Sequence, residues 1–277
     1  MRHSIGLHQV AERLGLHYMT VYRYVRTGKL AAHKVEGAWQ VEIADLQKFQ
    51  GRTEHASSTK RDSAPWSDRL EQRFRVGDLA GAWGVVEGAL SSGADPFRVY
   101  TEVMSPAITA ITMAVRAGEV PPQVEYIAHA VAARLVGRLG HRFARPGRKK
   151  GAVVTVTPPN DHRGLAAAMT ADILRGEGFD VLEMGTDVDA ASLVGVMADA
   201  HHLRAVVITV TEPNGFEAVS GLIDAVHDAE PKVRVAVGGL GLSSEEEAVG
   251  LGADLFLSSL GRLPEEFTKR LGDLGGQ

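Results

Sequence analysis

The sequence of 277 residues contains no cysteine. This absence excludes disulfide bonds, thiolate metal sites and cysteine nucleophiles, and it is typical of a cytoplasmic protein. No apolar run reaches the ~20 residues of a membrane-spanning helix, and the first residues lack the apolar segment of a signal peptide. The sequence also lacks a phosphate-binding glycine loop and a recognisable nucleophile–base pair. We therefore expect a cytoplasmic protein that is not an enzyme and does not bind membranes.

Acidic and basic residues are distributed unevenly. Residues 1–61 hold ten Lys or Arg and five Asp or Glu, a net charge of +5, whereas the other 216 residues hold 20 and 29, a net charge of −9. A basic end on an acidic body indicates an anionic partner for that end, or a tail kept soluble by its own charge. The length allows two or three domains of ~100–150 residues each.

The first 50 residues have the pattern of a small helical DNA-binding module. Helix spacing from Ile5 to Leu14 ends at Gly15, and a tight turn leads into a second short helix, Thr20 to Arg26. The second helix leaves Thr and Arg side chains facing outward, as in a helix-turn-helix. Residues 29–41 predict a hairpin, with Trp39 on its return strand, and Ile43 to Gln50 a last helix. The candidate DNA contacts are Thr20, Tyr22, Arg23, Arg26, Lys29 and Lys34.

This order of elements resembles the excisionase- and MerR-type winged helix-turn-helix. The resemblance covers about 50 residues, including the helix from Thr20, the wing with Trp39 and the segment Ala44-Asp45-Leu46. It implies that double-stranded DNA is a partner. The wing tip, Glu36-Gly37-Ala38, lacks the basic residues usual in this family. The resemblance therefore does not imply contacts between the wing and the minor groove. Binding of a protein partner is the alternative for this module.

Behind this module, the sequence predicts a linker and a helical bundle. Residues 51–65 have no apolar periodicity and are rich in Ser, Thr and charge, which is typical of a flexible linker. Residues 66–145 predict four helices with short connections, over 66–76, 79–91, 96–117 and 121–143. The basic run at 145–150 predicts a solvated connection or a contact to DNA phosphate.

Residues 146–277 predict an α/β domain. The run Ala152 to Thr157 is apolar and β-branched without alternation, as expected for a parallel strand buried on both faces. Further strands are predicted at 179–184, 205–210, 233–237 and 254–257, and helices at 165–175, 216–227, 244–251 and 263–271. Five strands alternating with five helices indicate a doubly wound sheet of order 2-1-3-4-5, whose ligand edge receives three loops. Candidate binding residues in these loops are Gly164, Thr209, Thr211, Gly238 and Gly239.

A helical bundle before such a sheet resembles the cobalamin-binding module, a bundle cap on a flavodoxin-like domain. With the MerR-type module in front, the chain resembles the light-sensing, cobalamin-dependent repressors of carotenoid genes. The supporting residues include Arg116 to Val120, Glu125, Leu174 to Phe179, Gly238-Gly239 and Gly252 to Asp254. The resemblance implies that cobalamin, as adenosylcobalamin or another form, binds between bundle and sheet and controls assembly on DNA.

The loop after the first strand departs from the family motif, Asp-x-His-x-x-Gly, in which the His ligates cobalt. Here Gly164 follows His162 by two residues, and alignment on the glycine places Asp161 where the His belongs. Either the loop shifts by one residue and His162 ligates the metal, or the lower face of the corrin has no His ligand. Neutral imidazole suits cobalt better than a carboxylate does, which favours His162.

The bundle departs from the family as well. The light-sensing repressors carry a Trp near the Arg-x-Gly-Glu turn and a Glu-His pair on the next helix, whereas here side chains smaller than Trp, including Met113 and Val115, occupy the first region. Glu125 is followed by Tyr126, with His129 one turn further on. Smaller residues predict more room above the corrin, for a different upper ligand or for a second chromophore such as a bilin. These five residues are further cofactor candidates, with helix-surface or bundle-packing roles as the alternative.

The chain is expected to be a DNA-binding regulator that cobalamin controls. It is further expected to act as a photoreceptor and to form a homo-oligomer. Three alternatives stay open at this point. The first is a cofactor-independent regulator with a degenerate cobalamin module, the second a bilin-plus-cobalamin light sensor, and the third a corrinoid carrier protein. The adjacent His201 and His202 are expected to point apart on a helix, which argues against a metal site there.

Overall fold

The computed structural model describes residues 66–213 and 215–272 and, in front of them, residues 4–6, 10, 25, 30–35, 38–43, 45 and 46. The chain divides into two compact units, Met1–Ala64 and Pro65–Gln277. Each unit is described by itself below.

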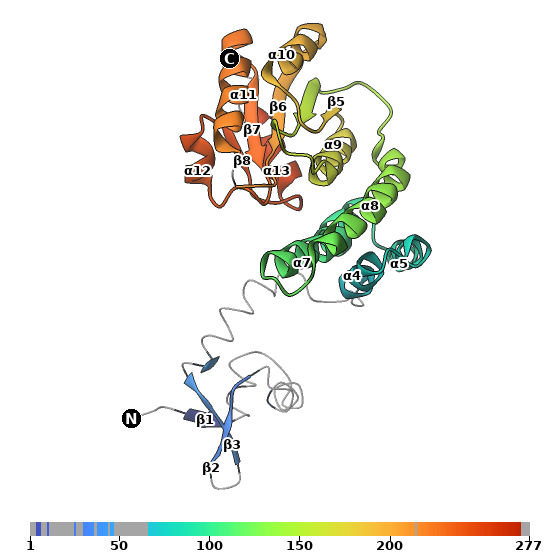
Figure 1. Cartoon of the computed structure of the whole chain (residues 1–277), viewed down its shortest axis with the longest axis vertical. Coiled ribbons are helices and arrows are strands. Elements are labelled where there is room, and N and C mark those ends of the chain that lie inside the picture. The colour runs from blue at the N-terminus through green and yellow to red at the C-terminus, as the bar shows by residue number, and fades with distance from the viewer. Residues whose placement is uncertain are drawn as a thin grey trace. The chain divides into compact units, whose positions relative to one another are not determined.

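The first unit contains a three-stranded antiparallel sheet (Figure 1). Strands β2 (His33–Val35) and β3 (Ala38–Glu42) form the predicted hairpin, with Trp39 on the return strand opposite Lys34. The structure adds β1 (Ser4–Gly6), which pairs with β3, so Ile5 lies in a strand and not at the start of a helix. The described part of this unit contains a buried hydrophobic core formed by Val10, Val25, Leu30, Val41 and Leu46.

Most of the predicted helix-turn-helix lies outside the described residues. The candidate DNA contacts Thr20, Tyr22, Arg23, Arg26 and Lys29 are among these residues. The predicted linker at 51–65 lies outside the described residues as well. Of the candidate DNA contacts, only the backbone of Lys34 is described, within β2. The assignment of these residues to DNA therefore stays a prediction.

The second unit begins with the helical bundle. Its elements are α4 (Trp66–Arg75), α5 (Leu79–Ser91), α6 (Pro96–Arg98), η1 (Val99–Met104), α7 (Ser105–Arg116), α8 (Pro122–Leu139) and η2 (Gly140–Phe143). The helix predicted over 96–117 is interrupted, because η1 is a π-helical segment. Asp78 and Asp95 accept hydrogen bonds from the first-turn amides of α5 and α6, which fixes where these helices begin.

The sheet domain follows, and its predicted topology is confirmed. Five parallel strands lie in the order β5-β4-β6-β7-β8: β4 (Ala152–Val156), β5 (Asp180–Gly185), β6 (Leu203–Thr209), β7 (Arg234–Gly238) and β8 (Leu255–Leu257). The connecting helices are α9 (Leu165–Gly176), α10 (Ala190–Asp199), α11 (Phe216–Ala229), α12 (Glu245–Gly250) and the closing α13 (Leu263–Gly272). No range had been predicted for α10. His201 and His202 lie in the turn after it, not on a helix as expected, and His202 has a φ of 55°.

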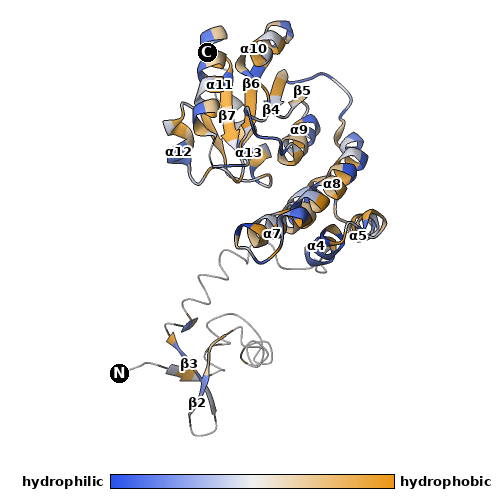
Figure 2. Cartoon of the chain, in the orientation of Figure 1, coloured by the Kyte–Doolittle hydropathy of each residue, from blue (hydrophilic) through white to orange (hydrophobic). Residues whose placement is uncertain are grey.

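Successive residues of the central strands enter two different cores. Val153 and Val207 pack with α9, α13 and the bundle, whereas Val154 and Val206 pack with α10, α11 and α12. All five residues of β4 are buried, and Figure 2 shows the apolar character of β6 and β7. The unbroken apolar run in the sequence therefore reflects a strand covered on both faces. Among the described residues, no helix is long and apolar enough to cross a bilayer.

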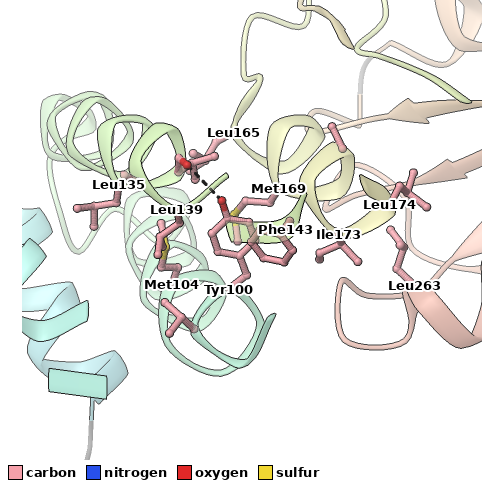
Figure 3. Close-up of a cluster of buried hydrophobic side chains, with 14 of the residues drawn as sticks. Tyr100, Met104, Leu135, Leu139, Phe143, Leu165, Met169, Ile173, Leu174 and Leu263 are labelled. Atoms are coloured by element: carbon pink, nitrogen blue, oxygen red, sulfur yellow. Dashed lines mark hydrogen bonds between the residues drawn. The ribbon is translucent and has the colours of Figure 1, made fainter. Parts of the chain in front are cut away.

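The bundle and the sheet domain share one hydrophobic core, centred on Tyr100 of the π-helical segment. Figure 3 shows Tyr100, Leu139 and Phe143 from the bundle side meeting Met169 and Ile173 of α9. The Tyr100 hydroxyl donates to Asp172 Oδ2 at 2.8 Å. Burial and the nearby Asp172 raise the pKa of Tyr100, so the phenol remains a donor. Arg175 donates to Asp172 Oδ1 at 2.9 Å, which supplies the second partner of this carboxylate.

The Tyr100–Asp172 hydrogen bond predicts a measurable loss of stability when it is removed. Tyr100→Phe leaves a buried carboxylate oxygen without its donor, which we expect to lower the free energy of unfolding by about 1–3 kcal/mol in urea titrations. Tyr126→Phe is the control, because Tyr126 is 74% exposed. Equal unfolding midpoints for Tyr100→Phe and the unmodified chain would contradict the role given to this bond.

Candidate cofactor cleft

Two adjoining cavities, of about 530 and 570 Å³, lie between the bundle and the carboxyl ends of the sheet strands. His129, Arg163 and Leu165 border both cavities, and we call the two together the cleft. Each has the size of a small-molecule or cofactor site. The carboxyl ends of the strands are also where ligands of doubly wound sheets bind.

The second cavity is a mainly apolar slot that runs into the sheet domain. We call it the deep slot. Bundle helix α7 roofs it, and α9 and the ends of β6, β7 and β8 form its walls. Its lining includes Ile108, Thr109, Met169, Thr170, Thr209, Thr211, Gly238, Gly239, Leu257 and Leu260. Thus Thr209, Thr211, Gly238 and Gly239, predicted from two separate loops, lie around one slot.

The two glycines at the end of β7 permit close backbone packing beside the deep slot. A Cβ on Gly238 would lie 2.6 Å from the carbonyl oxygen of Leu257. Gly239 has a φ of 116°, and a Cβ there would collide with the carbonyl of Val210. No other residue type fits both positions without shifting the backbone.

These distances predict opposite effects for two Gly→Ala substitutions. Gly238→Ala forces β7 and β8 apart and should lower the free energy of unfolding by about 1–3 kcal/mol. Gly221→Ala, on an exposed turn of α11 with nothing within 4 Å of the added carbon, should raise it by about 0.5–1 kcal/mol through helix propensity. Thermal or urea unfolding of both variants checks the pair, and a neutral Gly238→Ala would refute the close packing.

Asp161 is held in the loop after β4 as a buried, fully hydrogen-bonded carboxylate. It is 5% exposed. Thr211 donates to it twice, from the backbone amide to Oδ2 at 2.7 Å and from the hydroxyl to Oδ1 at 2.6 Å. The amide of Arg163 adds a third bond, at 3.2 Å. Asp161 thereby ties the loop after β4 to the loop after β6.

The neighbouring His162 lies differently. Its side chain is 72% exposed and borders the first cavity, with Nδ1 3.9 Å from Oδ2 of Asp187. Gly164 follows at the start of α9 and lines the same cavity. The structure thus places both loop candidates at the cleft, with Asp161 buried and His162 at the open rim.

A chain of charged and polar groups crosses the cleft from the bundle to the sheet loops. Arg163 lies 3.3 Å from Glu125 of α8 and 2.7 Å from Glu212 after β6. Thr112 of α7 donates to the other oxygen of Glu125 at 2.7 Å. From the end of α7, Arg116 donates to the carbonyl of Thr211 at 3.1 Å. We call Arg163, Glu125 and Glu212 the cleft bridge.

His129 of α8 lies behind the cleft bridge and borders both cavities. Its Nε2 is buried and has no hydrogen-bond partner among the described residues. The nearest carboxylate oxygen, of Glu125, is 4.0 Å away. Burial lowers the pKa of His129 and Arg163 lowers it further, while Glu125 opposes them. The imidazole is therefore neutral near pH 7.

The lowered pKa of His129 predicts a pH-dependent stability. Below the ordinary value of 6.5, the unfolded chain binds a proton that the folded chain resists, so the free energy of unfolding falls as the pH drops below about 6.5. His129→Gln removes this contribution and should flatten the curve between about pH 7 and pH 5. Urea unfolding at several pH values measures it, and parallel curves for the two proteins would contradict burial of a neutral imidazole.

Not every predicted cofactor residue reaches the cleft. Tyr126 borders the first cavity, but Met113 is 54% exposed, and neither Met113 nor Val115 lines either of these two cavities. Arg163 and Glu212 were not predicted, because only the fold brings them beside Glu125. Within the described residues, no three His, Asp or Glu side chains gather around a possible metal position. A metal ion bound here would therefore take most of its ligands from a cofactor and not from protein side chains.

The family comparison agrees with this geometry. Residues 151–257 match the model of the B12 binding domain, and residues 7–53 match that of a helix-turn-helix domain. The chain joins a helix-turn-helix domain to a B12 binding domain. The B12 match spans the sheet from β4 to β8, including the loops that line the deep slot.

Two similar proteins are monomethylamine corrinoid proteins. Monomethylamine corrinoid protein 1 of Methanosarcina acetivorans is 27% identical over 125 residues, which cover 44% of this chain and 57% of that protein. The matched region is thus a little over half of the relative's length. The structure of the Methanosarcina barkeri monomethylamine corrinoid protein superimposes with a TM-score of 0.67 at 16% identity, over 74% of this chain and 98% of that one. The second likeness establishes a shared fold.

Proposed function

We propose that this chain is a DNA-binding transcription regulator whose activity is set by cobalamin bound between the bundle and the sheet. The observation that carries the proposal is the cleft itself, with a deep slot at the carboxyl edge of a B12 binding domain and a helical roof. The helix-turn-helix match and the net charge of +5 over residues 1–61 support DNA as the partner. A cytoplasmic location follows from that partner.

The residues around the cleft fit a corrinoid. The deep slot offers apolar walls and glycine backbone to the nucleotide tail, and the first cavity offers space and polar side chains to the macrocycle. When bound, the cofactor supplies a light-sensitive carbon–cobalt bond. The chain's own residues orient it, exclude water from the slot and connect it to the bundle through the cleft bridge.

Control by light and by oligomerisation belongs to the same proposal. The cleft bridge joins the bundle to the sheet loops through ion pairs that a ligand entering the cleft must rearrange. A change in the ligand can therefore change the position of the bundle, which is the first element of the second unit. We infer that this movement alters the self-association of the chain and, with it, the affinity for DNA.

A corrinoid carrier for methyl transfer is the second candidate. The named relatives favour it, because they are corrinoid proteins. The helix-turn-helix match favours the regulator. Retention of promoter-length DNA at low salt distinguishes the two, since the carrier has no need to bind DNA.

The proposal predicts stoichiometric uptake of cobalamin. The full chain mixed with adenosylcobalamin or hydroxocobalamin in darkness should stay coloured after gel filtration. Ala166→Trp places an indole in the deep slot and should weaken binding at least tenfold. Ala191→Trp, on an exposed turn of α10 away from both cavities, is the matched control. A colourless chain with both cofactors would refute cobalamin as the ligand.

A further inference from the structure

We infer that the second unit carries a DNA-contacting surface of its own, on the last turns of α8 and the connection that follows it. Seven basic side chains form this surface, which we call the basic strip: Arg134, Arg138, Arg142, Arg145, Arg148, Lys149 and Lys150. The sequence alone left the last part of the strip as a solvated connection or a contact to DNA phosphate. The inference rests on the proposed function, because it takes double-stranded DNA as the partner.

The basic strip interrupts a unit that is otherwise acidic. Residues 126–160 hold seven Lys or Arg and no Asp or Glu, whereas the other residues from 62 to 277 hold 13 and 29. All seven side chains of the strip are exposed. Charges of one sign held this close repel each other, and an anionic partner removes that repulsion.

The arginines of the strip lack the carboxylate partners that other arginines of this unit have. At least eight other described arginines form ion pairs, such as Arg73 with Asp78 and Arg98 with Glu102, both at 3.0 Å. Among the described residues, no ion pair joins a carboxylate to any of the five strip arginines, and Lys150 lies 3.9 Å from Glu177. The guanidinium groups of the strip are therefore available to an external anion.

The basic strip is fixed to the fold at three points. Phe143, in the middle of the strip, is buried in the shared core with its ring centroid 4.8 Å from that of Tyr100. The amide of Lys150 donates to the carbonyl of Gly178 at 3.0 Å, and Arg138 lies 3.7 Å above the ring centroid of Trp83. Figure 1 shows α8 leading into this connection. A partner that binds the strip therefore does not have to order a free tail.

The spacing of the arginines suits a phosphate backbone. Arg134 and Arg138 are four residues apart on α8, and Arg142 follows in η2 at the same interval. At about 1.5 Å per residue the row spans roughly 12 Å. One DNA strand presents a phosphate about every 3.4 Å along the axis, so the row matches about three or four phosphates. Guanidinium binds phosphate through paired N–H groups and stays charged at physiological pH.

The composition of the strip favours nucleic acid over a lipid surface or a protein partner. Residues 134–150 are all described, and no large hydrophobic side chain among them is exposed. Amphipathic membrane segments and protein interfaces depend on apolar anchors, whereas contacts to the phosphate backbone do not. The helix-turn-helix match also supplies a duplex to the same chain, which raises the effective concentration of phosphate at the strip.

The salt dependence of DNA binding by the full chain tests the inference. Fluorescence anisotropy of a labelled, mixed-sequence duplex gives Kd between about 50 and 200 mM salt, where each phosphate contact contributes about 0.9 to the slope of log Kd against log salt. A triple variant, Arg134→Gln, Arg142→Gln and Arg145→Gln, removes three contacts. The slope should become shallower by about 2–3, and Kd at the lowest salt should rise at least about tenfold.

The matched control removes three exposed arginines that already have carboxylate partners. Arg73→Gln, Arg98→Gln and Arg262→Gln together change the net charge by the same amount. This variant should keep the slope of the unmodified chain to within about 1. Lysine in place of arginine at the three strip positions retains the charges and should keep the slope as well.

The outcomes separate this inference from the function on which it rests. Equal slopes for the strip variant and the control overturn the inference and leave the proposed regulator in place. Unchanged DNA binding, together with lost binding to phosphatidylserine vesicles, assigns the strip to lipid and overturns it as well. A full chain that does not bind the duplex at the lowest salt refutes the proposed regulator, and the inference falls with it. Gel filtration and thermal unfolding establish that each variant is folded before slopes are compared.

Discussion

The buried contact between Tyr100 and Asp172 is the constraint on which the rest of the second unit depends. It joins a helical bundle to helix α9, which covers one face of the sheet, inside a core that both share. A polar pair in such a place is costly when broken and demands one relative position of the two parts. The π-helical segment at Val99–Met104 is the local irregularity that carries Tyr100 to Asp172.

The cleft is therefore defined by two kinds of contact with different strengths. Apolar packing and the Tyr100–Asp172 bond hold its base, where the bundle meets α9. At its mouth the cleft bridge pairs Arg163 with the buried Glu125 and with the partly exposed Glu212. The exposed Arg163–Glu212 pair contributes little and is screened by salt. A cleft with a fixed base and a weakly held mouth suits a ligand that must enter, be retained and alter the position of the roof. This division of roles is the physical basis of the proposed sensor.

Much of this architecture could be predicted from the sequence, because burial leaves a local pattern. The unbroken run over β4 and the glycines at the end of β7 indicate the parallel sheet and its ligand edge. Helix α10 was not assigned a range, and the predicted helix at His201 and His202 is a turn. The π-helical segment also gave no signal, since its residues have ordinary helix spacing.

The site was predictable only in part, because its key relations are long-range. Asp161 and Thr211 are 50 residues apart and Arg163 and Glu125 are 38 apart, so no spacing rule joins them. The sequence left His162 as the favoured metal ligand, yet its exposure and the anchoring of Asp161 depend on how two loops meet. Met113 and Val115 were placed near the cofactor by resemblance, and the structure turns them away from both cavities.

The central claim is that the ligand in the cleft and the DNA on the first unit influence each other's binding. The most direct measurement is the affinity of the full chain for its operator DNA, titrated at fixed salt with and without saturating adenosylcobalamin in darkness. The account predicts a change of at least about fivefold in Kd, and by linkage the same change in cobalamin affinity when DNA is saturating. Identical DNA affinity with and without bound cobalamin, in a chain that binds both, would contradict it.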